Sequence, residues 1–171
     1  MGSNIDKEVN LPRAVRILRK CCRVTAVSTV YETVPVGLLD QPNFFNAAVQ
    51  IETDWDASQI KERLLSHIED RLQRVRQSEK NAPRTIDADL VLFNDEAFDY
   101  DCVDGACRHI PDLDLLRFAH AAVPVADILP DMPHPETAEP MAAIAARLMA
   151  AASSQDAAPL WPRPDVKLNG R

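Results

Sequence analysis

The sequence PRTIDADLVLF, residues 83–93, predicts a buried strand with charges in an unusual place. Residues 86–93 form an apolar run that only Asp87 and Asp89 interrupt, and turn-forming residues follow it. Residues two apart in a strand project from the same face, so the two carboxylate stems are expected about 6–7 Å apart.

A helix is predicted immediately upstream of that strand. Asp56 followed by Gln59 resembles a capping box, and apolar residues then recur at helical spacing from position 60 to Val75. The polar residues 76–83 end at a proline, which favours a loop rather than more helix. We therefore expect a helix, a moving loop and then the strand that carries the two aspartates.

The rest of the chain supplies further helices and strands. Apolar spacing and β-branched content predict helices at 12–22, 115–129 and 141–152 and strands at 24–33 and 44–53. The order helix, strand, strand, helix, strand matches most of a ferredoxin-like split βαββαβ sandwich, an α+β fold with a mainly antiparallel sheet. The last two helices are extra to it.

The two ends of the chain depart from that pattern. Only Met1 precedes Gly2, so the opening strand of the sandwich is expected to be missing. Residues 1–155 are expected to form one domain. Residues 156–171, which are rich in proline, are expected to form a disordered tail.

Composition excludes several classes of partner. A formal net charge of −7 and a pI near 5.0 argue against a general nucleic-acid or anionic-membrane binder. The sequence contains no apolar run of about 20 residues and no signal-peptide pattern, so a cytoplasmic location is expected. The four cysteines are expected to be reduced thiols, and the chain to be a monomer or a weak dimer.

The two aspartates are candidate metal ligands. Two unpaired carboxylates buried in an apolar strand would cost several kcal/mol, so cations or water must compensate them. Hard oxygen ligands favour Mg²⁺ over zinc. The alternative is that Asp87 and Asp89 lie on the solvent face of an edge strand, where no metal is needed.

Basic residues gather just before the aspartates, at positions 71, 74, 76, 80 and 84. A concentration of cations in an acidic protein suggests that an anion binds nearby, and arginine forks suit phosphate. A solvated helix end is the alternative, because cations favour the helix C-terminus. That alternative explains Arg74 and Arg76 but hardly Arg84.

The stretch Pro83-Arg84-Thr85-Ile86-Asp87-Ala88-Asp89-Leu90 resembles the signature of the 6-hydroxymethyl-7,8-dihydropterin pyrophosphokinases. Residues 2–4, 30–37, 41–47 and 69–76 resemble other segments of that family, in the same order. The likeness spans residues 2–130, and several ordered motifs are far less expected by chance than one short match.

The resemblance implies a reaction and a set of site residues. In that family the pterin hydroxyl attacks the β-phosphorus of ATP and AMP leaves, with two Mg²⁺ ions held by Asp87 and Asp89. These aspartates, with Arg74 and Arg84, are the catalytic residues that it implies. Implied pterin-binding residues are Thr33, Pro35, Val36, Phe44, Asn46 and His120. Implied ATP-binding residues are Glu69, Arg74, Arg76, Arg84, Ile110, Asp112 and Arg117.

Several positions depart from the family. Asn81 stands where a tryptophan is common in the moving loop, and Asp112 stands where a histidine is common on the ATP side. The order of Arg117, Phe118 and His120 permits two registers, so either ring could be the second one to stack on the pterin; His120 is favoured.

Two other functions are compatible with parts of the pattern. The missing strand and the altered ATP-side positions would suit a noncatalytic pterin- or nucleotide-binding relative. A metal-dependent phosphatase or nuclease could use the same aspartates, but Thr33, Phe44 and Asn46 would then have no purpose.

Overall fold

The computed structural model describes residues 1–75, 81–152 and 159–168. In chain order its elements are β1 (Gly2–Ser3), α1 (Lys7–Cys21), β2 (Arg23–Val27), β3 (Tyr31–Thr33), β4 (Phe44–Asn46), β5 (Val49–Glu52), α2 (Ala57–Gln59), the π-helical segment η1 (Ile60–Leu65), α3 (Ser66–Arg71), β6 (Phe98–Asp101), β7 (Cys107–Ile110), the 3-10 turn η2 (Leu113–Leu116), α4 (Ala119–Ile128), α5 (Met141–Ala152) and β8 (Leu160–Pro162).

The strands pair antiparallel in three groups, which confirms the α+β class. One sheet has the order β1-β4-β3-β8, while β2 pairs with β5 and β6 pairs with β7. The exact ferredoxin-like order stays a prediction. No helix in the described part of the chain is long and apolar enough to span a bilayer.

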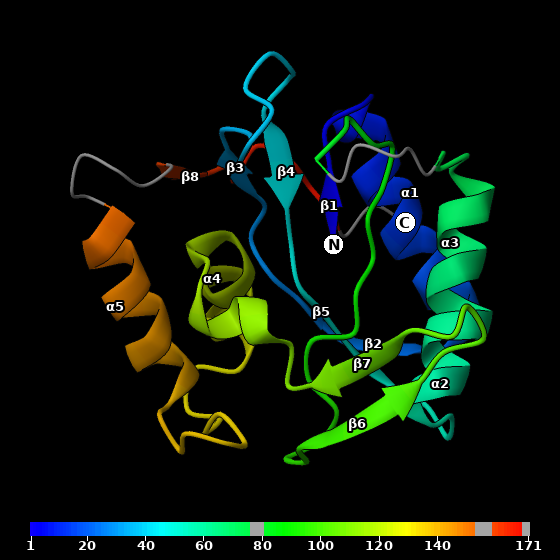
Figure 1. Cartoon of the computed structure of the whole chain (residues 1–171). Coiled ribbons are helices and arrows are strands. Elements are labelled where there is room, and N and C mark those ends of the chain that lie inside the picture. The colour runs from blue at the N-terminus through cyan, green and yellow to red at the C-terminus, as the bar shows by residue number, and fades with distance from the viewer. Residues whose placement is uncertain (76–80, 153–158, 169–171) are drawn as a thin grey trace.

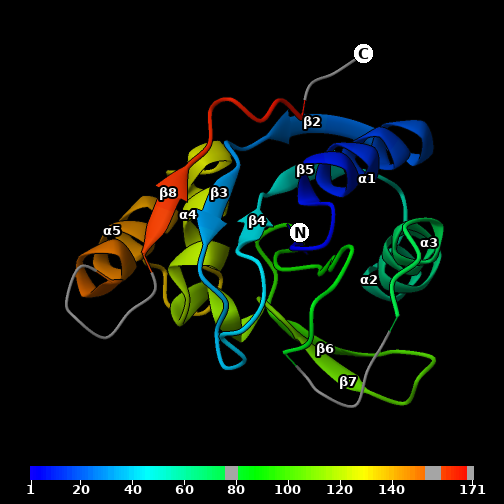
Figure 2. The same cartoon turned by 90° about the horizontal axis from the view of Figure 1, so that it is seen from above.

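Helices lie on both sides of the central strands (Figure 1). One apolar core joins α1 and the α2–α3 helix to the strands, and a second core joins α4 to α5. Seen from above, α4 and α5 lie on one side of β3 and β4, and α1 and α3 lie on the other (Figure 2). The predicted helix at 141–152 is confirmed as α5.

Each of the two long predicted strands is divided in two. Residues 24–33 contain all of β2 except Arg23 and all of β3, and residues 44–53 contain β4 and β5. The division falls at Ser28, whose hydroxyl accepts a hydrogen bond from the Ala48 N–H at 2.9 Å. Because a side chain takes this backbone donor, the regular ladder stops there and the strands change sheet.

The segment 86–93 is extended and its start is buried, but it is not the continuous strand that the sequence predicts. It makes one isolated bridge, between Asp87 and Gly2. Side chains take the next backbone groups: Lys61 Nζ donates to the Ala88 carbonyl at 3.0 Å, and Glu69 accepts from the Ala88 N–H at 3.4 Å. Because charged side chains replace a neighbouring strand, no ladder forms.

A short opening strand is present, contrary to the sequence prediction. Gly2 and Ser3 pair with β4, and Gly2 exchanges backbone hydrogen bonds of 2.8 and 2.7 Å with Asp87. The Ser3 hydroxyl also donates to the Thr85 carbonyl at 2.6 Å. Two residues therefore suffice to connect β4 with the aspartate segment.

The helices differ from the predictions mainly at their ends. Helix α1 begins at Lys7 rather than near residue 12. Asn10, expected to precede the helix as its cap, lies inside it, and its side-chain amide donates to the Ile5 carbonyl at 2.8 Å. The capping box of Asp56 and Gln59 is confirmed. Its helix ends at Arg71, and Val75, predicted on the apolar face, is 71% exposed.

Part of the expected disordered tail is ordered. Strand β8 pairs with β3, and Leu168 is only 4% exposed within the main core. Arg19 donates to the Leu168 carbonyl at 3.3 Å. The prediction is wrong for residues 159–168 because the free edge of β3 and this apolar anchor hold them.

Replacing Leu168 with alanine tests whether this segment stabilises the fold. Removing a buried leucine side chain should lower the free energy of unfolding by about 2 kcal/mol or more. Urea unfolding would measure the loss, with Leu39→Ala, at a 73% exposed leucine, as the matched control. Equal stability of the two variants would contradict a packed C-terminal segment.

His134 links the stability of the fold to pH. It is 1% exposed, its Nδ1 accepts from the Glu136 N–H at 3.3 Å, and burial lowers its pKa, with Glu136 and Glu139 opposing this effect. The unfolded chain therefore binds the proton first, and the stability contributed by neutral His134 is lost as pH falls below about 6.5.

The variant His134→Leu should remove this pH dependence. Between pH 7 and pH 5, wild-type stability should fall relative to that of the variant, because the other three histidines are the same in both proteins. Urea unfolding across that range measures the difference. A constant difference between the two curves would show that His134 does not titrate with unfolding.

Candidate functional site

Two arginines hold the carboxylate of Asp87. Arg74 Nη1 lies 2.9 Å from Asp87 Oδ1, and Arg84 Nη1 donates to Asp87 Oδ2. Arg74 Nη1 also donates to the Ile86 carbonyl at 2.6 Å. The Asp87 side chain is 26% exposed and paired on both oxygens, which differs from the solvent face of an edge strand. The structure thus brings together three of the four predicted catalytic residues.

Glu69 contacts both Arg74 and the segment that carries Asp87 and Asp89. It is 5% exposed, it accepts from the Ala88 N–H, and its Oε2 lies 3.9 Å from Arg74 Nε. One buried carboxylate therefore contacts both the aspartate segment and one of its arginines. The predicted contact of Glu69 with ATP stays a prediction, since these contacts are all with the protein.

Asp89 has a different partner, which the sequence did not identify. Lys61 Nζ lies 3.3 Å from Asp89 Oδ1, and the Asp89 side chain is 47% exposed. Burial raises the pKa of Asp89, but the charges of Lys61 and of the N-terminal amino group, the Lys61 hydrogen bond and the charge of Arg108 more than offset this and leave the pKa below its ordinary value. Asp89 is therefore held as a carboxylate.

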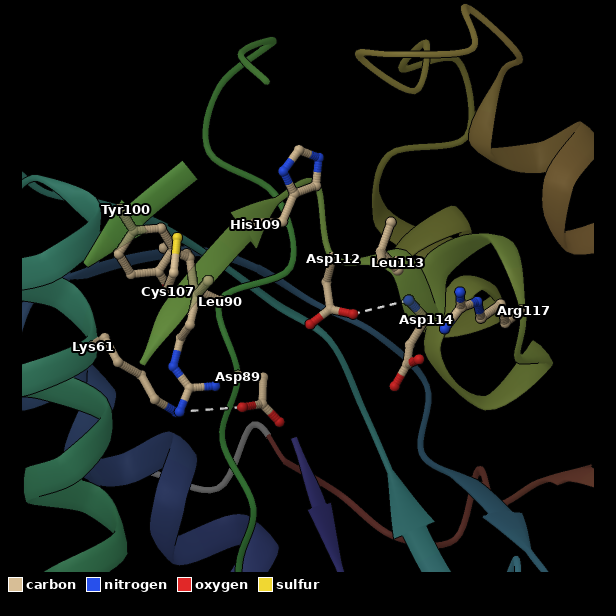
Figure 3. Close-up of a pocket in the computed structure, with 11 residues that line it drawn as sticks. Lys61, Asp89, Leu90, Tyr100, Cys107, His109, Asp112, Leu113, Asp114 and Arg117 are labelled. Atoms are coloured by element: carbon tan, nitrogen blue, oxygen red, sulfur yellow. Dashed lines mark hydrogen bonds and ion pairs between the residues drawn. The ribbon is translucent and has the colours of Figure 1, made fainter. Parts of the chain in front are cut away.

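A cavity of about 490 Å³ lies beside Asp89 (Figure 3). Its charged lining contains Lys61, Asp89, Arg108, Asp112, Asp114 and Arg117. Figure 3 shows Lys61 and Asp89 at one side of the cavity and Asp114 with Arg117 at the other. The volume lies within the usual range for small-molecule sites.

The predicted ATP-binding residues divide around this cavity. Asp112 and Arg117 line it, whereas Ile110 is fully buried in a core cluster with Tyr100. Burial raises the pKa of Asp112, and the nearby charges of Asp114 and Asp89 add to that effect. Arg76 lies outside the described residues.

Apolar side chains complete the cavity wall. Leu90, Tyr100 and Leu113 line it together with the charged groups. Burial raises the pKa of Tyr100 to about 12. A flat base and a charged phosphate chain are the kind of ligand that such a mixed lining accommodates. Sequence reasoning missed Tyr100 and Arg108 because their roles depend on the pairing of β6 with β7.

A second group of predicted residues lies on β3 and β4. The Asn46 amide donates to the Thr33 hydroxyl at 2.9 Å, and both side chains are buried. Gly2 lies against them, since a Cβ at that position would be 3.1 Å from Asn46 Oδ1. Glycine therefore allows β1 to approach the amide closely.

Phe44 connects this group with the charged one. It pairs with Thr33 in the β3–β4 ladder, and its ring centroid lies 5.8 Å from the guanidinium carbon of Arg84. Arg84 thus contacts Asp87 on one side and an aromatic ring on the other. In the loop that follows β3, Pro35 is buried and Val36 is 48% exposed.

The other aromatic candidates lie next to each other. The rings of Phe118 and His120 stack with their centroids 5.1 Å apart and an angle of 21° between them. Burial lowers the pKa of His120, which favours the neutral ring. Because the rings stack together, the structure does not choose between the two registers, and a role for His120 stays a prediction.

Asn81 packs against the loop after β3. A Cβ at Gly37 would lie 2.4 Å from Asn81 Nδ2, and Gly37 has a φ of 83° that suits glycine. Gln41 Nε2 donates to the Asn81 carbonyl at 2.8 Å. The described end of the predicted moving loop therefore packs on the loop that carries Pro35 and Val36.

Comparison with known proteins identifies relatives of the chain. The sequence model of a family described as 7,8-dihydro-6-hydroxymethylpterin-pyrophosphokinase matches residues 1–130. The 2-amino-4-hydroxy-6-hydroxymethyldihydropteridine pyrophosphokinase of Methylorubrum extorquens is 38% identical over 135 residues, which cover 77% of this chain and 81% of the relative.

Two further relatives match only part of their own length. The Bacillus subtilis protein of the same name is 44% identical over 99 residues, or 56% of this chain and 58% of the relative. The folic acid synthesis protein fol1 of Schizosaccharomyces pombe is 34% identical over 143 residues, or 82% of this chain and 19% of the relative. The chain thus spans less than two thirds of either protein.

The variant Thr33→Val tests the buried contact with Asn46. Valine has nearly the same shape as threonine but leaves the Asn46 amide donor unpaired, which should cost about 1–3 kcal/mol of stability. Urea unfolding would measure this, with Thr25→Val, at an exposed threonine of β2, as the control. A loss no larger than that of the control would mean that the hydrogen bond does not fix the two side chains.

Proposed function

The chain belongs to the 7,8-dihydro-6-hydroxymethylpterin-pyrophosphokinase family, and from this premise we propose that it transfers pyrophosphate from ATP to 6-hydroxymethyl-7,8-dihydropterin. The products are the pterin diphosphate and AMP. The observation that carries the proposal is the position of Arg84, which contacts the Asp87 carboxylate and the Phe44 ring. A phosphate-binding group and a ring-binding group meet at this one side chain.

The aspartates suit magnesium. Magnesium in nucleotide sites is commonly held by one or two carboxylates together with substrate phosphates and water. Asp87 and Asp89 supply two such carboxylates; within the described ranges no group of three or more His, Cys, Asp or Glu side chains could hold a metal alone. Two Mg²⁺ ions bound there would neutralise charge on the phosphate oxygens and align them.

Arg74 and Arg84 bind the triphosphate in this proposal. Guanidinium groups hold two phosphate oxygens at once and keep their charge when buried. Their side chains are 11% and 17% exposed, so both are already positioned with little freedom left to lose. Transfer of this kind needs positioning and charge compensation rather than a covalent step on the protein, and the attacking group is the pterin hydroxyl.

The cavity beside Asp89 is where the nucleotide is proposed to bind. Asp112 and Arg117 line it, and Ile110 is proposed as a further contact although its side chain is buried in the core. Glu69 acts by holding Arg74 and the aspartate segment, and Arg76 is proposed as a further triphosphate contact. In this proposal the phosphates lie between the cavity and Asp87.

The pterin is proposed to bind against β3 and β4. Asn46 and Thr33 offer amide and hydroxyl groups to the polar edge of the ring, and Phe44 offers a stacking face. Pro35 and Val36 cover the site from the loop after β3, and His120 is the second ring. We also propose that the protein is cytoplasmic, that it is a monomer or a weak dimer, and that it binds neither nucleic acid nor membranes.

AMP production tests the proposal directly. The purified chain with ATP, Mg²⁺ and 6-hydroxymethyl-7,8-dihydropterin should form AMP only when the pterin is present. The double variant Asp87→Ala and Asp89→Ala should lower that rate by at least about 100-fold, because charge compensation at the phosphates is lost. Chromatographic assay of AMP measures both.

The matched control removes two exposed aspartates, Asp54 and Asp95, and should retain wild-type activity. Phosphate release from many esters would instead favour a phosphatase or nuclease. Binding of ATP and the pterin by the folded wild type without AMP formation would contradict the proposal and favour a noncatalytic binding protein.

A further inference from the structure

A buried lysine forms one wall of the cavity. Lys61 lies in η1 and is only 6% exposed, although its ammonium faces the same cavity as Asp89 (Figure 3). Its neighbours on this face of the helix, Leu64, Leu65 and Ile68, are all buried. A leucine at position 61 would continue this apolar face, so the lysine requires another explanation.

The ammonium is compensated by two oxygen atoms of the aspartate segment. Lys61 Nζ donates to the Ala88 carbonyl at 3.0 Å and to Asp89 Oδ1 at 3.3 Å. Removing an ammonium from water costs several kcal/mol, and these contacts offset that cost only while Asp89 stays in place. Lys61 and Asp89 therefore fix each other.

The pairing of Asp89 differs from that of Asp87 in a way that matters for cations. Among the described residues, Asp87 forms ion pairs with two planar guanidinium groups, whereas Asp89 forms one with the compact ammonium of Lys61. The N-terminal amino group and Arg108 act on Asp89 through their charge. An ammonium is a strongly hydrated point charge that can move on a flexible stem. The Ala88 carbonyl and the Asp89 carboxylate that it contacts are hard oxygen donors, the kind that magnesium also prefers.

We propose that Lys61 is a positioning residue that occupies the place of a cation at Asp89 until magnesium arrives with its nucleotide. This inference rests on the proposed function, in which Asp89 binds Mg²⁺. The ammonium keeps Asp89 oriented and repels free Mg²⁺ from it. When the nucleotide brings its own negative charge, the ammonium turns from Asp89 to a phosphate oxygen.

Opposite shifts in two binding constants test this role. In calorimetric titrations without nucleotide, Lys61→Met should bind Mg²⁺ about tenfold more tightly than the wild type, because a repelling charge is gone. With Mg²⁺ present, the same variant should bind α,β-methylene-ATP about tenfold more weakly, because a phosphate contact is gone. Lys20→Met, at an exposed lysine of α1, should change neither constant.

A structural role alone would give another result. If Lys61 only anchored the helix to the Ala88 carbonyl, its loss would weaken both ligands, and unchanged or weaker Mg²⁺ binding overturns the proposal. Lys61→Gln keeps an N–H donor without the charge, so it provides the same test if the methionine variant fails to fold. In an Asp89→Asn background, Lys61→Met should no longer affect Mg²⁺ binding.

The outcome is separable from that of the proposed function. The Mg²⁺ titration uses no pterin and no turnover, so an inactive chain that still shows the tightening would support the role of Lys61 while the pyrophosphokinase proposal fails. Pterin-dependent AMP formation without tighter Mg²⁺ binding by Lys61→Met would support the pyrophosphokinase proposal and contradict the proposed role of Lys61. An absence of Mg²⁺ binding in the wild type and in both Lys61 variants also overturns it.

Discussion

The ion pairs of Arg74 and Arg84 with Asp87 hold the segment 84–89 in position. In the described part of the chain this segment pairs with Gly2 by one bridge, and the N–H groups of Asn4 and Ile5 donate to the Arg84 carbonyl. Side chains take the backbone groups of Ala88. Buried ion pairs are costly to form, and removal of one partner leaves an uncompensated charge. Without ligands, the geometry of the segment therefore depends on these ion pairs.

The ion pairs of Asp87 lie between two chemically different regions. On one side are the buried polar groups of β3 and β4, with the ring of Phe44 beside them. On the other side is the cavity lined by Asp89, Arg108 and other charged residues. Because Arg84 contacts Phe44 and Asp87, its place is compatible with a substrate ring and a phosphate chain that meet near the same guanidinium.

The sequence predicts this region well where chemistry is local. The spacing of Asp87 and Asp89 and the arginines before them identify the charged segment, and the Asp56 capping box marks the start of its helix. The burial of the other site residues depends on contacts with residues that are distant in the sequence. Lys61 looks like an ordinary helix lysine until its helix is placed against Ala88 and Asp89.

The ends of elements are predicted less well for the same reason. The continuous strand expected at 86–93 does not form, because side chains of Lys61 and Glu69 take the backbone hydrogen bonds of Ala88. The tail expected to be disordered pairs through β8 because β3 has a free edge. Neither effect can be found from periodicity, since each depends on a residue more than fifteen positions away.

The position of a bound metal tests the central claim most directly. Crystals grown with Mn²⁺ in place of Mg²⁺ and with α,β-methylene-ATP would show the metal by its anomalous scattering. The account predicts peaks in contact with the carboxylates of Asp87 and Asp89, next to the nucleotide phosphates. A nucleotide bound in the cavity with its metal elsewhere, and both aspartates still paired with Arg74, Arg84 and Lys61, would contradict it.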